Sequence, residues 1–166
     1  IVIDGIEPTV SSISPTDNNS DVSITENISV TFSEAMDNTS VTTNTTDTTC
    51  SGSFKLSSDN FSSCVQMSSA PSSSNSNKTF TIDPSSNLSY STTHKITLTT
   101  GVKDKVGNIL NSEYQTITGF TTIIEPEPVW SFAHNINKLA TNQSIVGKAI
   151  SLDSNSNVYI AVRSTA

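Results

Sequence analysis

Residues Lys78–Leu110 read KTFTIDPSSNLSYSTTHKITLTTGVKDKVGNIL and carry the clearest strand pattern in the chain. Within Thr79–Ile82 the threonines alternate with Phe80 and Ile82, so an extended backbone puts the two apolar side chains on one face. The segment His94–Leu98 alternates in the same way. Both segments are predicted to be strands that bury one face and expose the other.

Turn signals bound these two strands. Asp83–Ser86 reads Asp-Pro-Ser-Ser; proline lacks the backbone donor that a central strand needs, and Asp and Ser side chains bond to turn backbone. Further along, Gly107 and Asn108 favour the positive φ of a tight reversal. The stretch is therefore predicted to be a series of strands joined by turns.

Further candidate strands lie on both sides of this stretch. A short edge strand is expected around Val41, and Ser68–Asn77 is expected to be a flexible connection. The other candidates are Val10–Ile13, an edge pairing at Val22 and Ile24, Ile28–Phe32, a hairpin of Phe54–Leu56 with Val65–Met67, and Tyr114–Ile117 continuing towards Phe120.

Short strands at fairly regular spacing, without a helical period, predict an all-β fold. The expected architecture is an antiparallel β-sandwich of about seven strands. One shared core is expected from the residues on the apolar strand faces, which are Phe32, Phe80, Ile82, Ile96 and Leu98.

Short motifs occur in the order in which one known family has them. They are Pro8–Val10, Val30–Asp37 (VTFSEAMD), Thr79–Pro84, Leu88, Thr93–Ile96, Gly101–Asp104, Gly107–Asn108 and Gly119–Thr122. On these motifs, residues 8 to 122 resemble the bacterial Ig-like domain of S-layer and secreted surface proteins, which implies an Ig-like sandwich. Two features depart from the family pattern: His94 stands where tyrosine is usual, and the insertion from Cys50 to Cys64 is longer than a minimal domain needs.

The chain is expected to divide into four parts. Residues 1–7 are a linker or the end of a preceding domain, 8–123 the Ig-like sandwich, and 124–129 a linker rich in proline and glutamate. Residues 130–166 begin a further domain, in which 149–161 is similar to one hairpin of a bacterial β-propeller repeat. One blade cannot bury its own faces and depends on neighbouring blades, so the fragment is expected to stop inside that domain. Only a C-terminal β-hairpin fragment is expected there.

Composition excludes two classes of partner. The 166 residues carry a formal net charge of −7 and no cluster of lysine and arginine, so nucleic acid is not an expected partner. No apolar run reaches the roughly 20 residues of a membrane span, so no membrane insertion is expected in this fragment. Serine and threonine make up about a third of the chain, which suits polar strand faces and long loops.

Cys50 and Cys64 flank a serine-rich segment with no His, Asp or Glu set beside them at zinc spacing. A disulfide is expected, the alternative being two independent buried thiols. Such a bridge would restrict the unfolded chain by roughly 3 kcal/mol in the loop-entropy model. It would also imply an oxidising compartment.

Glu34, Asp37 and Asp104 are the candidate metal ligands. They lie in loops after strands, and if these loops meet at one end of the sandwich, the three carboxylates would repel one another without a cation. Calcium is the ion that such hard oxygen ligands suit. The alternative is that Asp37 and Asp104 cap turns through backbone hydrogen bonds while Glu34 is solvated.

A second pattern imitates a calcium site. Asp153, Asn155 and Asn157 have the spacing that opens a calcium-binding loop, but Val158 and Ser164 stand where that loop needs glycine and glutamate. A hairpin turn is therefore expected at these residues.

Catalysis is not expected. A serine nucleophile needs a histidine base held by a carboxylate, and the only histidines are His94 and His134. Since His94 shares its strand face with Ile96 and Leu98, it is expected to have a partly buried structural role. No nucleophile elbow, phosphate loop or glycine-rich dinucleotide turn occurs, and apart from calcium no cofactor is expected.

These features favour a non-catalytic Ig-like spacer of a bacterial secreted or cell-surface protein. The resemblance implies an extracellular or outer-envelope location, with the adjacent domains of the same protein, including the propeller, as partners. The alternative is an adhesin module that binds a host extracellular protein or a glycan through loops at one pole. Fold by itself supports that alternative only by analogy.

Overall fold

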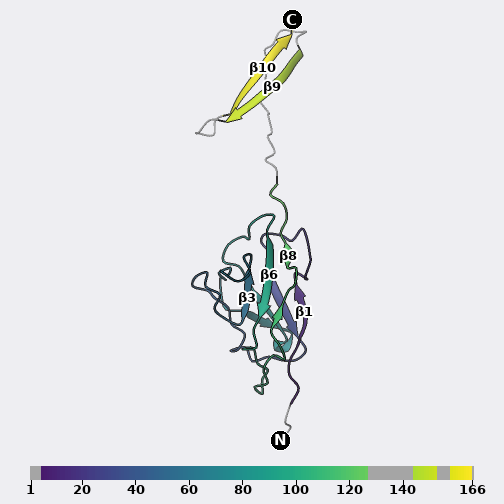
Figure 1. The fold of residues 1–166 in the computed structure, drawn as a ribbon, viewed down its shortest axis with the longest axis vertical. Coiled ribbons are helices and arrows are strands. Elements are labelled where there is room, and N and C mark those ends of the chain that lie inside the picture. The colour runs from purple at the N-terminus through teal and green to yellow at the C-terminus, as the bar shows by residue number, and fades with distance from the viewer. Residues whose placement is uncertain (1–4, 127–143, 153–157, 166) are drawn as a thin grey trace. The chain divides into compact units, whose positions relative to one another are not determined.

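A computed structural model describes residues 5–126, 144–152 and 158–165 (Figure 1). In this part of the chain the secondary structure is strand except for one short 3₁₀ turn, Asn75–Asn77, so the all-β prediction is confirmed. The chain divides into two compact units, Ile1–Pro126 and Glu127–Ala166. None of the described residues belongs to a helix long and apolar enough to cross a membrane.

The first sheet of the first unit has the strand order β1–β2–β5–β4, with every pair antiparallel. At its centre, Val30 of β2 lies opposite Phe80 of β5, so the alternating apolar residues of both strands share one face. The strands are β1 (Val10–Ser14), β2 (Ile28–Phe32), β4 (Ser72–Ser74) and β5 (Thr79–Ile82).

The second sheet is built on β6 (Thr93–Leu98). On one side β6 pairs with β3 (Phe54–Ser57), and on the other with β7 (Tyr114–Gln115) and β8 (Phe120–Thr121). All these pairs are antiparallel, and β7 and β8 pair with opposite ends of β6.

The two sheets bury one hydrophobic core between them. Phe32 and Phe80 of the first sheet meet edge to face, with ring centroids 6.0 Å apart. The same cluster of buried side chains contains all five predicted core residues, Phe32, Phe80, Ile82, Ile96 and Leu98, so that prediction is confirmed.

The predicted hairpin between Phe54–Leu56 and Val65–Met67 is wrong. β3 pairs with β6 instead, and only one bond, from Val65 N to Leu56 O (2.8 Å), joins the two segments. Met67 forms a bridge with Pro84. Since β6 offers β3 a longer apolar partner than Val65–Met67 does, the distant pairing replaces the local one.

Two further predictions for this region are also wrong. Ser68–Asn77 is not merely a connection, because it contains β4, which pairs with β5. All three residues of β4 are exposed serines, so no apolar alternation marks the strand. Around Val41 there is no strand: Val41 is buried, and the nearest pairing is an isolated bridge between Thr43 and Gly52.

The predicted strand from Tyr114 towards Phe120 is interrupted. Thr116 N donates to Ile96 O (3.0 Å), and Phe120 pairs with His94. Thr116 and Phe120 are four residues apart, but their partners Ile96 and His94 on β6 are only two residues apart. Two extra residues therefore bulge out of the sheet. The bulge carries Ile117, whose side chain is 84% exposed.

The chain enters and leaves the first unit at opposite ends of β6 (Figure 1). At the end of β6, Asn111 in the following loop donates its N–H to Pro8 O (3.0 Å). At the start of β6, Thr122 N donates to Thr92 O (3.1 Å). The length of the sandwich therefore separates its two connections.

In the second unit, β9 (Ser144–Leu152) and β10 (Val158–Thr165) form an antiparallel hairpin. The register shifts between Ala161 and Val162. The predicted C-terminal β-hairpin is confirmed. The calcium-like residues 153, 155 and 157 and also His134 lie outside the described residues.

Candidate functional site

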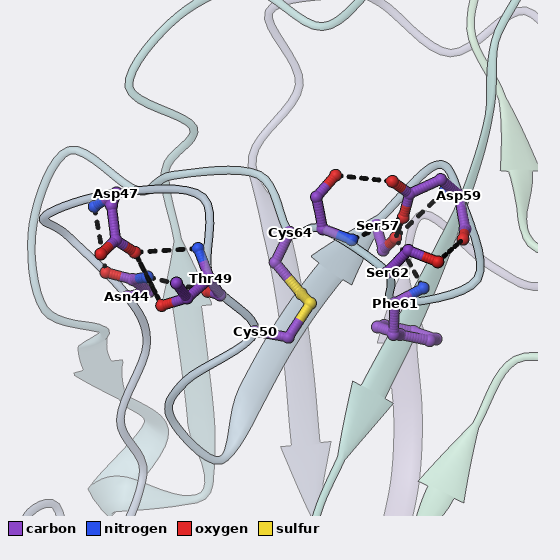
Figure 2. Close-up of a disulfide and its surroundings, with 10 residues drawn as sticks. Asn44, Asp47, Thr49, Cys50, Ser57, Asp59, Phe61, Ser62 and Cys64 are labelled. Atoms are coloured by element: carbon purple, nitrogen blue, oxygen red, sulfur yellow. Dashed lines mark hydrogen bonds between the residues drawn. A yellow bond between two sulfur atoms is a disulfide. The ribbon is translucent and has the colours of Figure 1, made fainter.

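Cys50 and Cys64 form a disulfide in the loop region around β3 (Figure 2). Their Cα atoms are 5.0 Å apart. Cys64 is buried, and its N–H donates to Thr48 O (2.8 Å). Both cysteines of the chain are therefore used, and the bridge ties the segment before β3 to the segment after it.

An aspartate-centred turn lies on one side of the disulfide (Figure 2). Asp47 Oδ1 accepts bonds from Thr49 N (2.8 Å), Thr49 Oγ1 (2.7 Å) and the side-chain amide of Asn44. The side-chain bonds from Thr49 and Asn44, followed by the backbone bond, lower the pKa of Asp47. The ionised carboxylate therefore orders a tract that contains almost no apolar residues.

A second turn on the other side is centred on Asp59. Its carboxylate accepts bonds from Ser63 Oγ (2.6 Å), Ser63 N (2.9 Å) and Ser57 Oγ (2.8 Å). These bonds, with that of the Ser63 hydroxyl the strongest, lower the pKa of Asp59 from 3.8 to about 2. The disulfide is thus held between two turns that both depend on a charged aspartate.

The candidate calcium ligands Glu34, Asp37 and Asp104 are not brought together as one group. In the part of the chain that the structure describes, no three His, Cys, Asp or Glu side chains are placed to share a metal ion. The loops themselves are neighbours, because Asp37 N donates to Lys103 O (2.9 Å) and Met36 forms a bridge with Asp104.

The two aspartates turn to their own loops. Asp104 Oδ1 accepts the N–H groups of Val106 (2.9 Å), Gly107 (2.7 Å) and Asn108 (2.8 Å), while Asp37 Oδ1 accepts Thr39 N (2.9 Å). Burial by itself would raise the pKa of Asp104, but the bonds from its loop outweigh burial and lower it. This geometry favours the turn-capping alternative, and calcium binding stays a prediction.

Sequence patterns did not reveal the role of Asp17. Its Oδ1 accepts the N–H groups of Gly119 (2.6 Å) and Thr118 (3.1 Å), and its Oδ2 accepts that of Ile117 (3.0 Å). Burial acts to raise the pKa of Asp17, but these backbone bonds lower it. One carboxylate thus satisfies the donors that the bulge between β7 and β8 removes from the sheet.

Gly119 fixes the bulge against β6. Its φ is +87°, and a Cβ at this position would lie 2.3 Å from His94 O. Gly119 O accepts the N–H of Asn18 (2.7 Å), in the turn that carries Asp17. The only signal in the sequence was a turn-like run at 15–19, because the partner of that turn lies about a hundred residues away.

His94 is buried in the second sheet, with 3% of its surface exposed. Its ring stacks on Phe120, with centroids 5.5 Å apart, and Nδ1 bonds Thr92 O (3.1 Å). Because a carbonyl oxygen only accepts, Nδ1 carries the proton and Nε2 is unprotonated. Burial lowers the pKa of His94 more than the bond to Thr92 raises it. A backbone carbonyl orients this ring, whereas a hydrolase triad uses a carboxylate.

Residues 4–122 match the sequence profile of the bacterial Ig-like domain. The chain belongs to the bacterial Ig-like domain family. No curated protein matches the sequence.

Three structures of the S-layer protein SbsC are similar to this chain. A crystal structure of SbsC and a structure of its domains 1–6 each have 22% identity and a TM-score of 0.47, covering 93% of this chain and 19% of theirs. A crystal structure of the N-terminal part of SbsC has 22% identity and a TM-score of 0.48, covering 93% of this chain and 32% of that one. The Ig-like chain therefore spans less than two thirds of the length of these proteins.

Proposed function

We propose that the Ig-like domain is a non-catalytic spacer that joins neighbouring domains of a bacterial secreted or cell-surface protein. The observation that carries the proposal is the placement of the two chain connections at opposite ends of β6. The six residues of β6 span about 20 Å at the usual rise of a strand. A domain connected in this way adds its length to a chain of domains rather than folding it back.

An extracellular or cell-surface location fits the same proposal. It is supported by the bacterial Ig-like family and by the Cys50–Cys64 disulfide, since such bridges persist in oxidising compartments. The disulfide and the aspartate-capped turns would also keep the loops of the domain rigid.

The proposed neighbour on the C-terminal side is a β-propeller that begins at residue 130, after a linker at 124–129. The β9–β10 hairpin supports this proposal, together with the similarity of residues 149–161 to a propeller hairpin. A hairpin alone is marginal in water, so further strands would have to cover it.

A domain exchange in the whole protein tests the spacer role. An epitope tag is placed after Ala166, and antibody binding to the tag is measured on intact cells. In one variant residues 8–123 are deleted, and in another they are replaced by an unrelated sandwich whose termini also lie at opposite ends. Deletion is expected to lower antibody access, and replacement is expected to restore it. If normally expressed replacement protein fails to restore access, or deletion changes nothing, the domain is not a spacer.

A second candidate function is an adhesin module that binds a host protein or a glycan through loops at one pole. A pocket between two loops near the start of β6 favours it. Attachment of cells to glycan-coated surfaces, with and without residues 8–123, tests this role; equal attachment would exclude it.

A further inference from the structure

A pocket of about 310 Å³ opens between the disulfide loop and the loop after β5. This volume is at the small end of the ~300–1,000 Å³ range of ligand sites, so it suits a ligand of one ring rather than a large one. The lining residues are Thr48, Ser58, Ser63, Cys64, Val65, Gln66, Ser85, Ser86, Asn87, Leu88, Ser89 and His94.

Bonds between the walls fix the shape of the pocket. Ser85 N donates to Gln66 O (2.9 Å), which joins the two loops directly. Leu88 N donates to Ile24 O (2.8 Å), and the disulfide holds Cys64 on the opposite wall. A ligand would therefore meet a preformed site and would not have to order it on binding.

His94 supplies an unused acceptor to this pocket. The residue is 3% exposed, and its Nδ1 is committed to Thr92 O. Its Nε2 has no hydrogen-bond partner among the described residues, yet the residue lines the pocket. Nε2 is not one of the fully buried polar atoms that lack a partner in the described residues, so water reaches it, and a sugar hydroxyl can take the place of that water.

The chemistry of the lining selects a neutral polyol. None of the lining residues is Asp, Glu, Lys or Arg, although the chain carries a net charge of −7. Hydroxyl groups dominate the walls, with amides from Gln66 and Asn87 and small apolar surfaces from Val65 and Leu88. A sugar ring presents the matching combination of several hydroxyls and apolar C–H faces.

We propose that this pocket binds one neutral sugar unit of a glycan, with His94 Nε2 accepting a hydrogen bond from a sugar hydroxyl. The proposal rests on the second candidate function and is independent of the spacer role. Its test measures ligand occupancy, whereas the attachment assay measures the adhesin role, so a failure of either one is seen separately.

The test is an NMR titration of the ¹⁵N-labelled 166-residue chain with the methyl glycosides of glucose, galactose and N-acetylglucosamine. Glucuronic acid serves as the charged comparison. At least one neutral sugar is expected to bind in the millimolar range, shifting the amides of Ser63, Ser86 and Asn87 and the side-chain Nε2 signal of His94. Glucuronic acid is expected to bind more weakly.

Two variants locate the site, and a third serves as their control. Replacing His94→Phe keeps an aromatic ring on Phe120 but removes the acceptor, and Ser86→Tyr fills the pocket from an exposed rim position without touching the core. His94→Phe is expected to weaken sugar binding about fivefold, the effect of losing one hydrogen bond of average strength. Ser86→Tyr is expected to abolish the shifts of the pocket amides, because its ring occupies the site. Ser112→Tyr, an exposed serine after the end of β6, is expected to leave binding unchanged.

Three outcomes overturn the proposal. In the first, no neutral sugar shifts the pocket amides. In the second, the Ser86→Tyr variant binds sugar as the wild type does. This outcome can be read even if the His94→Phe variant fails to fold. In the third, the charged sugar binds tighter than the neutral ones, so that charge and not hydroxyl recognition governs the pocket.

Discussion

Individual aspartates organise the loops of this domain. Each of the carboxylates that cap a turn accepts at least one backbone N–H, and bonds of this kind favour the charged form. They replace the apolar contacts that a serine- and threonine-rich chain cannot supply to its loops. The capping residues are Asp17, Asp37, Asp47, Asp59 and Asp104.

Replacing Asp17→Asn is expected to lower the free energy of unfolding by about 1–3 kcal/mol, because charge-assisted bonds to three N–H groups of the bulge are lost. Urea denaturation measures the loss. The matched control is Asp21→Asn, since Asp21 is exposed, accepts only the Ser20 hydroxyl among the described residues and has a φ of 57° that asparagine tolerates. Equal midpoints for the two variants would show that the bonds to the bulge do not stabilise the fold.

Stability is expected to fall in two steps as the pH is lowered. His94 has a folded pKa below 6.5, so the unfolded chain takes up a proton first and stability declines as the pH drops below 6.5. The capping aspartates have folded pKa values below 3.8, so their contribution is complete above 3.8 and is lost as the pH falls through the folded values, to about 2 for Asp59.

Denaturation midpoints measured from neutral pH downward check this prediction. His94→Phe should abolish the first decline and keep the second, because the capping aspartates are unchanged. Persistence of the decline just below pH 6.5 in that variant would assign the decline to another group.

At the scale of elements, strands were predictable where apolar residues alternate. Thr79–Ile82 and Ile28–Phe32 have the bounds expected from their pattern, and both lie at the centre of a sheet. β4 was not predictable, because an all-serine edge strand depends on the ladder with β5 and not on its own side chains. The partner of β3 was mistaken because a hydrophobic pattern fixes which face is buried and does not name the neighbouring strand.

Gly119 in the bulge between β7 and β8 is required for two separable reasons, its positive φ and its close approach to β6. Gly107 and Gly119 both have positive φ, +102° and +87°, but only at Gly119 would a Cβ meet backbone, 2.3 Å from His94 O. Gly107→Ala is expected to cost about 1–2 kcal/mol for the left-handed conformation alone. Gly119→Ala is expected to cost about 1–3 kcal/mol more, since the two strands must move apart.

Chemical denaturation of the two glycine variants side by side gives the difference. The Asn108 and Asp104 bonds around Gly107 are kept in the first variant, so it serves as the control for the second. If both substitutions cost the same, the close approach of Gly119 to β6 does not constrain the bulge.

At the scale of the whole molecule, the parts of the candidate site differ in how far the sequence could foresee them. The disulfide and the turn at Asp104 depend on residues close together in the chain, so local patterns indicated both. The pocket near His94 depends on the meeting of the disulfide loop, the loop after β5 and the start of β6. No local pattern encodes such a meeting, and for the same reason the capping of the bulge by Asp17 went unpredicted.

The proposed boundary at residues 124–129 makes the first unit a domain in its own right. Its buried side chains, from Ile13 to Phe120, form one continuous core across both sheets, and both of its chain connections are hydrogen-bonded within the unit. The melting temperature of a chain ending at Pro126 is therefore expected to lie within roughly 4 °C of that of the 166-residue chain. A shift of this size corresponds to about 1 kcal/mol of stability. Limited proteolysis is expected to cut between Ile124 and Lys148 and to leave this core folded, as followed by mass spectrometry and calorimetry. Replacing Phe120→Ala in both chains provides the control, because it should lower both melting temperatures equally if the core lies wholly within the first unit. If truncation alone lowers the melting temperature by many degrees, residues beyond the linker are part of the sandwich and the chain is one domain.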